Sequence, residues 1–210
     1  GVVYHVRAFA EHGAAQGWAT NSTTFNTTAL TTWSNQMRIT FAGYTDHDVL
    51  TDFPALVTFN TSIPGFSYAD FQQGTPNDLR FSGPDGAALS YDIESWDTSG
   101  VSRIWVKLPT LSTQQQSIVA YWGNIDAAAA VDAEDVWSSD FRAVWHLNES
   151  PLDSTAFGKH ATEEGNSYTS GVAGAGARFD SDDSFMRPNL FKEWFGDNID
   201  DLTFSLWTRP

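Results

Sequence analysis

The sequence contains no cysteine, and this absence excludes several kinds of site. A chain of 210 residues without cysteine has no disulfide framework, no thiolate nucleophile and no cysteine-based metal site. Its length and its hydrophobic content of 41% are nevertheless sufficient to bury a sizeable core. We therefore expect a globular protein whose stability comes from side-chain packing.

Basic residues and long apolar runs are also scarce. The 11 Lys and Arg residues stand against 26 Asp and Glu residues, which gives a formal net charge of −15. Nucleic acids and anionic membrane surfaces bind basic patches, so we expect no nucleic-acid partner. No stretch approaches the ~20 apolar residues of a membrane span, so we expect no membrane insertion in this chain. This acidity suits an extracellular protein, or one that binds a cation such as Ca²⁺.

Apolar and polar residues alternate along most of the chain, which predicts β-strands, and no stretch has a convincing helical period. The predicted strands are 3–10, 22–28, 37–41, 55–60, 79–83, 89–96, 102–109, 117–124, 142–150, 176–182 and 202–208. Turn-forming sequences separate them, and residues 126–136 fit a short helical turn or a linker. We predict an all-β fold of β-sandwich or jelly-roll modules in tandem. Both ends fall inside alternating patterns, so we interpret the chain as part of a longer protein whose last module is incomplete.

The stretch LSYDIESWDTSGVSRIWVKLP (89–109) predicts a β-hairpin with a loop at 97–100. One face of this hairpin would be wholly apolar, with the pairs Leu89–Leu108, Tyr91–Val106 and Ile93–Ile104. The other face would carry the pairs Ser90–Lys107, Asp92–Trp105, Glu94–Arg103 and Trp96–Val101.

Asp92 and Glu94 are two neighbouring carboxylates, as in the acid pair of a glycosidase. The predicted hairpin nevertheless favours a structural role for them. Residues i and i+2 on a strand lie roughly 6.6 Å apart, between the retaining and inverting carboxylate separations. An arginine opposite Glu94 would lower the pKa of that carboxyl, which is unfavourable for a general acid. We expect no catalytic residues. His146 is expected to be packed or hydrogen-bonded rather than a catalytic base.

The nine tryptophans suggest a carbohydrate-binding surface, because exposed aromatic faces stack on sugar rings. Most of them are expected to fill β-sandwich cores. Trp96 and Trp105 lie on the predicted polar face of the hairpin, so we select them, with Asp92 and Glu94, as candidate ligand-binding residues, provided that no other segment covers that face.

The acidic loops provide a weaker indication of calcium. Asp153 and Asp180 lie in loops rich in Ser and Gly, and Ca²⁺ prefers several carboxylate and carbonyl oxygens. We select Asp153 and Asp180 as candidate metal ligands and Ca²⁺ as the one cofactor considered. Solvated loop carboxylates are the alternative, and no fixed calcium-binding spacing is present.

Three stretches resemble known families. Residues 33–124, with WSNQMRITFAGY, LTDFPALVTFN, DLRFSG, YDIESW, IWVKLP and IVAYWGN, resemble a bacterial and archaeal family known only as a domain of unknown function. The stretch AVWHLNESPLDSTAFGKHAT with GVAGAGARFDSDDSF and LTFSLWTRP resembles the beginning of a laminin-G-like, concanavalin-A-like jelly roll. VYHVRAFAEHGAAQGWATNSTTFNT is similar to the last two strands of a fibronectin-type-III-like repeat. These resemblances imply domains at 1–30, 31–137 and 138–210.

The resemblances imply a large modular protein that is secreted or displayed on a cell surface. Some relatives of the central domain are joined to proton-channel subunits, which leaves the periplasm as an alternative location. In laminin-G-like modules calcium often binds near the sheet edge, where the sequence at 153–155 would lie. We expect a non-catalytic binding or adhesion module whose partner is a glycan or a cell-surface ligand. The alternatives are an ancillary or active region of a secreted polysaccharide-degrading enzyme, and a structural spacer.

Overall fold

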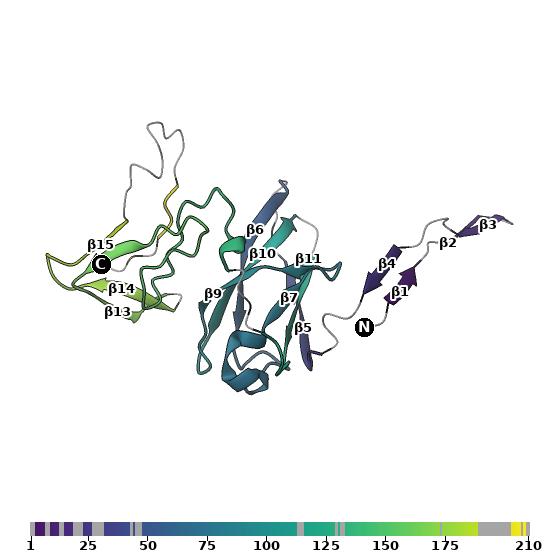
Figure 1. Cartoon of the computed structure of the whole chain (residues 1–210), viewed down its shortest axis with the longest axis horizontal. Coiled ribbons are helices and arrows are strands. Elements are labelled where there is room, and N and C mark those ends of the chain that lie inside the picture. The colour runs from purple at the N-terminus through teal and green to yellow at the C-terminus, as the bar shows by residue number, and fades with distance from the viewer. Residues whose placement is uncertain are drawn as a thin grey trace.

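The computed structural model describes residues 3–6, 9–12, 15–18, 23–26, 32–42, 44, 48–112, 116–128, 130, 133–172, 174–188, 203–206 and 208. Within these residues the chain forms antiparallel β-strands and short 3₁₀ turns, with no α-helix (Figure 1). The all-β prediction is confirmed. No helix in the described part of the chain is long and apolar enough to cross a membrane.

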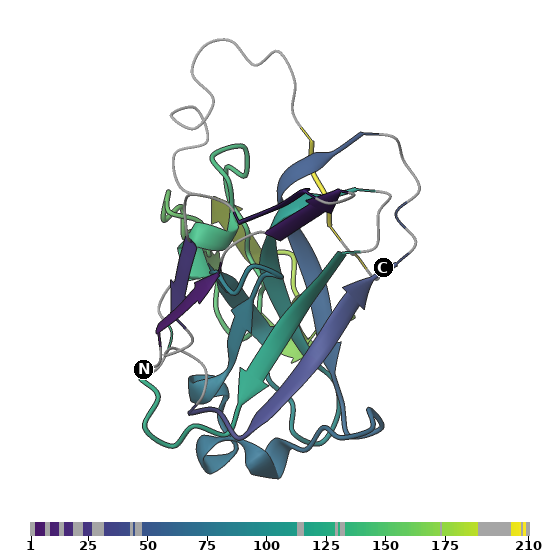
Figure 2. The same cartoon turned by 90° about the vertical axis from the view of Figure 1, so that its right-hand side faces the viewer.

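Two antiparallel sheets face each other across a common core in the middle of the chain. The first sheet has the order β6 (Leu50–Phe59), β10 (Ser102–Leu111), β9 (Tyr91–Ser95). The second has the order β5 (Asn35–Phe41), β11 (Gln116–Trp122), β7 (Arg80–Ser82), β8 (Ala88–Leu89). Figure 2 shows β5 and β11 side by side at the front of this sandwich.

Alternating side chains of both sheets fill the core. On β10, Ile104 and Val106 are completely buried, and on β11 Trp122 is only 1% exposed. Burial of each large apolar side chain contributes ~1.5–3 kcal/mol, so the core strongly determines which face of each strand points inward. Because successive strand residues point to opposite faces, Trp105 between Ile104 and Val106 lies on the outer face of the first sheet.

The hairpin of β9 and β10 confirms part of the predicted register. The pairs Tyr91–Val106, Asp92–Trp105 and Ile93–Ile104 are present as predicted.

The predicted strand 89–96 is split at Ser90. Leu89 pairs with Phe81 in the second sheet rather than with Leu108. The predicted Leu89–Leu108 pair is therefore wrong, because the chain changes sheets between β8 and β9.

Three 3₁₀ turns between β6 and β7 were not predicted from the sequence. They are η1 (Tyr68–Asp70), η2 (Gln72–Gly74) and η3 (Pro76–Asp78). The buried carboxylate of Asp78 accepts hydrogen bonds from the backbone amides of Gln72, Gly123 and Asn124. This side chain therefore attaches the turns to the end of β11.

The chain after β11 continues through η4 (Ala133–Val136), an irregular segment and two strand pairs. The pairs are β12 (Ala161–Glu164) with β15 (Phe185–Pro188), and β13 (Asn166–Ser170) with β14 (Ala175–Phe179). The predicted strand 142–150 is wrong, because this segment forms only one isolated bridge, from Trp145 to Asp153. In Figure 1 these strand pairs lie on the β9 side of the sandwich.

The regions at the two ends of the chain are described in part. Near the N-terminus, β1 (Val3–Val6) pairs with β4 (Thr23–Asn26), and β2 (Phe9–His12) pairs with β3 (Ala15–Trp18). The side chains that would identify a fibronectin-type-III-like repeat lie outside the described residues. In the predicted strand 202–208, residues 203–206 and 208 have no strand assignment, and the other two positions lie outside the described residues.

Candidate functional site

The outer face of the β9–β10 hairpin carries a buried polar cluster. Asp92 and Glu94 on β9 are 6% and 8% exposed, which is unusual for carboxylates. Residues from the segment after β11 cover them. The cluster consists of Asp92, Glu94, Trp105, Trp137, His146 and Asn148, and it is called the Asp92–Glu94 cluster below.

A β-bulge determines where Glu94 and its neighbours point. Ile104 pairs with Ile93, but the preceding residue Arg103 pairs with Ser95, so Glu94 is the extra residue on β9. The predicted Glu94–Arg103 pair is therefore wrong. Arg103 instead donates a hydrogen bond from Nη1 to the carbonyl oxygen of Val101.

The same bulge places Trp96 on the inner side of the sheet. Its ring packs edge-on against Tyr68 and Phe71, at centroid distances of 5.2 and 4.9 Å. Its Nε1 donates a hydrogen bond to the carbonyl oxygen of Gly74. Trp96 and Trp105 thus lie on opposite faces of the sheet, and they do not form the shared aromatic platform that the predicted register implied.

Asp92 holds two side chains through one carboxylate oxygen. Nε1 of Trp137 donates to Oδ2 of Asp92 at 2.9 Å, and Nε2 of His146 lies 2.7 Å from the same oxygen. This distance joins the imidazole and the carboxylate in a side-chain hydrogen bond. His146 is thus both packed and hydrogen-bonded, as expected, through a partner 54 positions away in the sequence.

Glu94 makes contacts through its side chain and its backbone. Its Oε2 accepts a hydrogen bond from Nε1 of Trp105 at 2.5 Å, and its backbone carbonyl accepts one from Nδ2 of Asn148 at 3.1 Å. Nδ1 of His146 lies 3.9 Å from Oε2 of Glu94, which is too long for a hydrogen bond. Among the described residues, His146 is the only basic side chain within 4 Å of either carboxylate.

Aromatic rings close the cluster from outside. The ring of Trp137 lies 5.6 Å from that of Trp105, 5.2 Å from that of Phe141 and 5.9 Å from that of His146. Val136, next to Trp137, is completely buried. The segment from η4 to residue 148 therefore covers the face on which the sequence placed the candidate ligand-binding residues.

A second contact lies beside the cluster. Gly174 approaches Ser95 so closely that a Cβ atom at this glycine would lie 3.0 Å from Cβ of Ser95. The φ angle of Gly174 is +104°, which side-chain-bearing residues rarely adopt. The loop before β14 thus contacts β9 at a position that only glycine fits well.

The hairpin loop is ordered by Asp97. Its Oδ1 accepts hydrogen bonds from the hydroxyl and the backbone amide of Ser99, at 2.8 and 2.9 Å. These bonds hold the pKa of the Asp97 carboxyl below its usual value, with a smaller contribution from the charge of Arg103. Arg103 thus influences a loop carboxylate rather than Glu94.

The carboxylate of Asp153 is surrounded by donors from its own loop. It accepts hydrogen bonds from the backbone amides of Val144, Thr155 and Lys159 and from the hydroxyl of Thr155. These four bonds favour an organising role in the loop over the predicted calcium site.

The other candidate ligand, Asp180, is half exposed and pairs with Nε of Arg178 at 2.6 Å. Among the described residues, no group of three or more His, Asp or Glu side chains could hold a metal ion.

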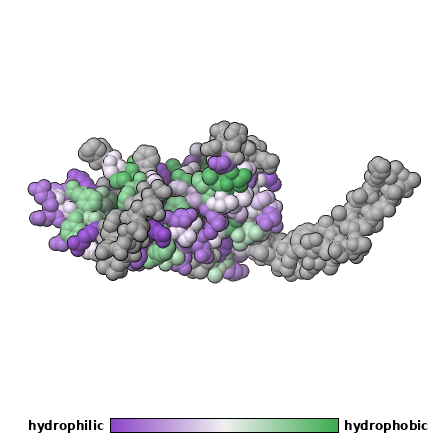
Figure 3. All heavy atoms as spheres, turned by 90° about the horizontal axis from the view of Figure 1, so that it is seen from above, coloured by the Kyte–Doolittle hydropathy of each residue, from purple (hydrophilic) through white to green (hydrophobic). Residues whose placement is uncertain are grey.

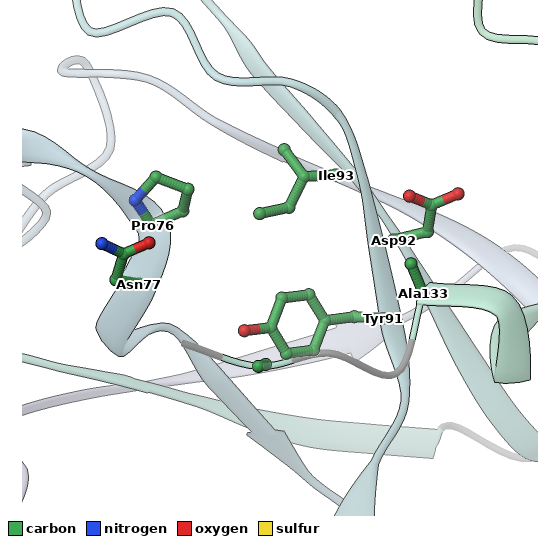
Figure 4. A pocket seen from close by; sticks show the side chains of 7 residues that line it. Pro76, Asn77, Tyr91, Asp92, Ile93 and Ala133 are labelled. Atoms are coloured by element: carbon green, nitrogen blue, oxygen red, sulfur yellow. The ribbon is translucent and has the colours of Figure 1, made fainter. Parts of the chain in front are cut away.

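A shallow pocket of about 210 Å³ lies next to β9, but the two carboxylates do not open into it together. It is lined by Pro76, Asn77, Tyr91, Asp92, Ile93, Ala130 and Ala133. Figure 4 shows Tyr91 and Ile93 on the side of the strand that faces Pro76 and Asn77, whereas the carboxylate of Asp92 points to the other side. The geometry of an acid pair flanking a bound substrate is therefore absent from this pocket.

One family model matches part of the chain. Residues 75–157 match the model of a family described as "Domain of unknown function (DUF2341)". All six residues of the Asp92–Glu94 cluster fall inside this range, and the match extends beyond residue 137. No curated protein and no solved structure matches the chain.

Proposed function

We propose that the chain is a non-catalytic β-sandwich module of a modular extracellular protein, and that it holds the following segment in a fixed orientation. The Asp92–Glu94 cluster carries this proposal. It uses the buried carboxylate of Asp92 and the backbone carbonyl of Glu94 to attach residues 137–148 to the outer face of the sandwich. Buried contacts of this kind restrict the relative motion of consecutive units.

The contacts favour this role over catalysis. Both carboxylates are over 90% buried, and both accept hydrogen bonds from tryptophan indoles, which have no acid–base function at neutral pH. A general acid or base must reach its substrate within ~2.6–3.2 Å or through one water molecule. Trp137 and His146 occupy that position at Asp92.

The contacts also limit where a glycan could bind. A sugar ring stacked on Trp105 would have to displace Trp137 from its position 5.6 Å away. Trp96 packs into the core with Tyr68 and Phe71. Over the face seen in Figure 3, polar and apolar residues are interspersed. Our proposal therefore contains no glycan site at the two tryptophans.

Because the chain has no cysteine, spin labels can test directly whether the segment after β11 is held in a fixed orientation. Thr40 on β5 and Ser167 on β13 are exposed, so each can be replaced by cysteine and spin-labelled without competing thiols. Pulsed electron spin resonance should give one narrow distance distribution between the two labels. The triple variant Asp92→Asn, Glu94→Gln, His146→Phe should broaden this distribution. An equally narrow distribution in the triple variant would contradict the proposal.

Matched controls distinguish a structural joint from catalysis and from ligand binding. Arg103→Gln changes a charged residue of the same hairpin outside the cluster, and it should leave the distance distribution unchanged. If the wild type released reducing sugar from a polysaccharide and Asp92→Asn or Glu94→Gln abolished this release, the two carboxylates would be catalytic. Glycan-array binding that is lost in Trp105→Ala would show that the outer face is a ligand site.

A further inference from the structure

The turn after β6 contains the sequence Asn60-Thr61-Ser62, which has the Asn-x-Ser/Thr pattern of N-glycosylation acceptors. The backbone amide of Ile63 donates to the carbonyl oxygen of Asn60 at 3.2 Å, which closes a turn over these residues. Thr61 and Ser62 are exposed. The pattern thus lies at the surface, where a transferase can reach a folded chain.

The side-chain amide of Asn60 has a defined orientation. Its Oδ1 accepts hydrogen bonds from the backbone amide of Ser62, at 2.9 Å, and from the hydroxyl of the same residue. Because a backbone N–H can only donate, the atom that faces it is the amide oxygen and not the nitrogen. The nitrogen, Nδ2, has no hydrogen-bond partner among the described residues, and it is the atom that glycosylation modifies.

Asn148-Glu149-Ser150 has the same sequence pattern, but here the side-chain nitrogen of the asparagine is hydrogen-bonded. Nδ2 of Asn148 donates to the backbone carbonyl of Glu94, so it is already used in the Asp92–Glu94 cluster. Glu149 has a φ angle of +64°, which gives this segment a different backbone from the turn at 60–63. Asn21-Ser22-Thr23 and Asn26-Thr27-Thr28 also have this pattern, but their side chains lie outside the described residues. Sequence pattern alone does not distinguish Asn60 from Asn148, whereas their hydrogen bonds do.

We propose that Asn60 is an N-glycosylation site. Nδ2 forms a bond to the anomeric carbon of an oligosaccharide, the bond from this carbon to a lipid pyrophosphate breaks, and Nδ2 loses one proton. The donor class is a polyisoprenyl-pyrophosphate-linked oligosaccharide, and the catalyst is a membrane-bound oligosaccharyltransferase. In the organism this reaction requires export of the chain, as in the proposed function.

A glycan at Asn60 would stand at the end of an edge strand. In the described part of the chain β6 pairs with β10 alone, so its other edge has no strand partner. An open groove of about 330 Å³ with a mixed polar and apolar lining runs between β5 and β6, and its apolar side chains include Met37, Ile39, Leu56 and Ile63. Unprotected edges promote association between sheets, and a bulky hydrophilic glycan would hinder it.

The proposal can be tested in vitro on the folded chain. The chain is incubated with an oligosaccharyltransferase that requires only Asn-x-Ser/Thr, together with its lipid-linked oligosaccharide, and the peptides are mapped by mass spectrometry. We expect the peptide containing Asn60 to carry the glycan in the wild type and in Ser62→Thr, but not in Ser62→Ala. The peptide containing Asn148 should remain unmodified.

A synthetic peptide spanning residues 56–65 serves as the acceptor control in the same mixture. An unmodified Asn60 in the folded chain, with the control peptide modified, would overturn the proposal. Equal modification of Asn60 and Asn148 would overturn the argument from their hydrogen bonds. Because the result at Asn60 does not depend on the cluster, failure of glycosylation at Asn60 is distinguishable from failure of the proposed function.

Discussion

Replacement of His146 by Phe is the most direct perturbation of the Asp92–Glu94 cluster. Phenylalanine retains an aromatic ring beside Trp137 but removes the ring nitrogen that lies 2.7 Å from Oδ2 of Asp92. A hydrogen bond to a charged group contributes about 1.5–3 kcal/mol, and among the described residues Trp137 is the only side-chain donor that Asp92 would retain. We expect the free energy of unfolding to fall by about 2–3 kcal/mol, which is more than tenfold in the equilibrium constant.

This loss should be measured by urea denaturation, with tryptophan fluorescence and circular dichroism as independent probes. In an Asp92→Asn background the same replacement should cost less, with a coupling energy of about 1–2 kcal/mol between the two positions. Arg103→Gln is the matched control, with an expected change within about 0.5 kcal/mol. A coupling energy near zero, or a larger loss in Arg103→Gln than in His146→Phe, would refute the assigned contacts.

Three further predictions concern other parts of the chain. Gly174→Ala should lower the melting temperature, because its φ angle of +104° and the close approach to Ser95 cost about 1–3 kcal/mol. Calcium should leave the melting temperature unchanged relative to a chelator, because four donors already surround the carboxylate of Asp153. Burial and the hydrogen bond to Glu163 raise the pKa of Tyr168 to about 12, from 10.0. Its contribution to stability is therefore complete below pH 10 and lost as the pH rises toward 12, and Tyr168→Phe should remove this alkaline dependence.

Each of these predictions has a control or a contradicting result. Gly158→Ala also places a side chain at positive φ, but nothing lies within 4 Å of its Cβ, so it should cost less than Gly174→Ala. A calcium-dependent rise in melting temperature that disappears in Asp153→Asn would restore the calcium site. Identical loss of stability above pH 10 in the wild type and in Tyr168→Phe would contradict the assigned cause.

The hairpin shows how far the sequence predicts this fold. Alternation along 89–109 correctly predicted that Ile104 and Val106 point inward and that Asp92 faces Trp105, because burial of one face specifies the register. The bulge at Glu94 was not predicted, because one extra residue leaves no mark in a pattern of short strands. This single residue changed the partner of Arg103 and moved Trp96 to the core side.

The cluster shows where sequence reasoning ends. Asp92 and Glu94 were recognised as unusual, but Trp137 and Asn148 were not connected to them. Their partners lie 45 and 54 positions away, and no local period links such distant residues. The choice of Trp105 as a ligand-binding residue depended on no other segment covering the outer face of the hairpin. In the structure, η4 and the residues that follow it cover that face.

The placement of the cluster also affects how the chain would respond to a pulling force. The covalent route from β11 to residue 148 runs through the segment 123–136, whereas the cluster joins residues 137–148 directly to β9 and β10. Tension applied beyond residue 148 is therefore carried first by the hydrogen bonds of the cluster, two of which share Oδ2 of Asp92, and by the packing of Val136 and Trp137. These bonds would break and release the intervening length of chain before the strands of the sandwich separate. The same contacts that fix an orientation at rest would thus act as an extensible link under load, and the hydrophobic core would remain intact.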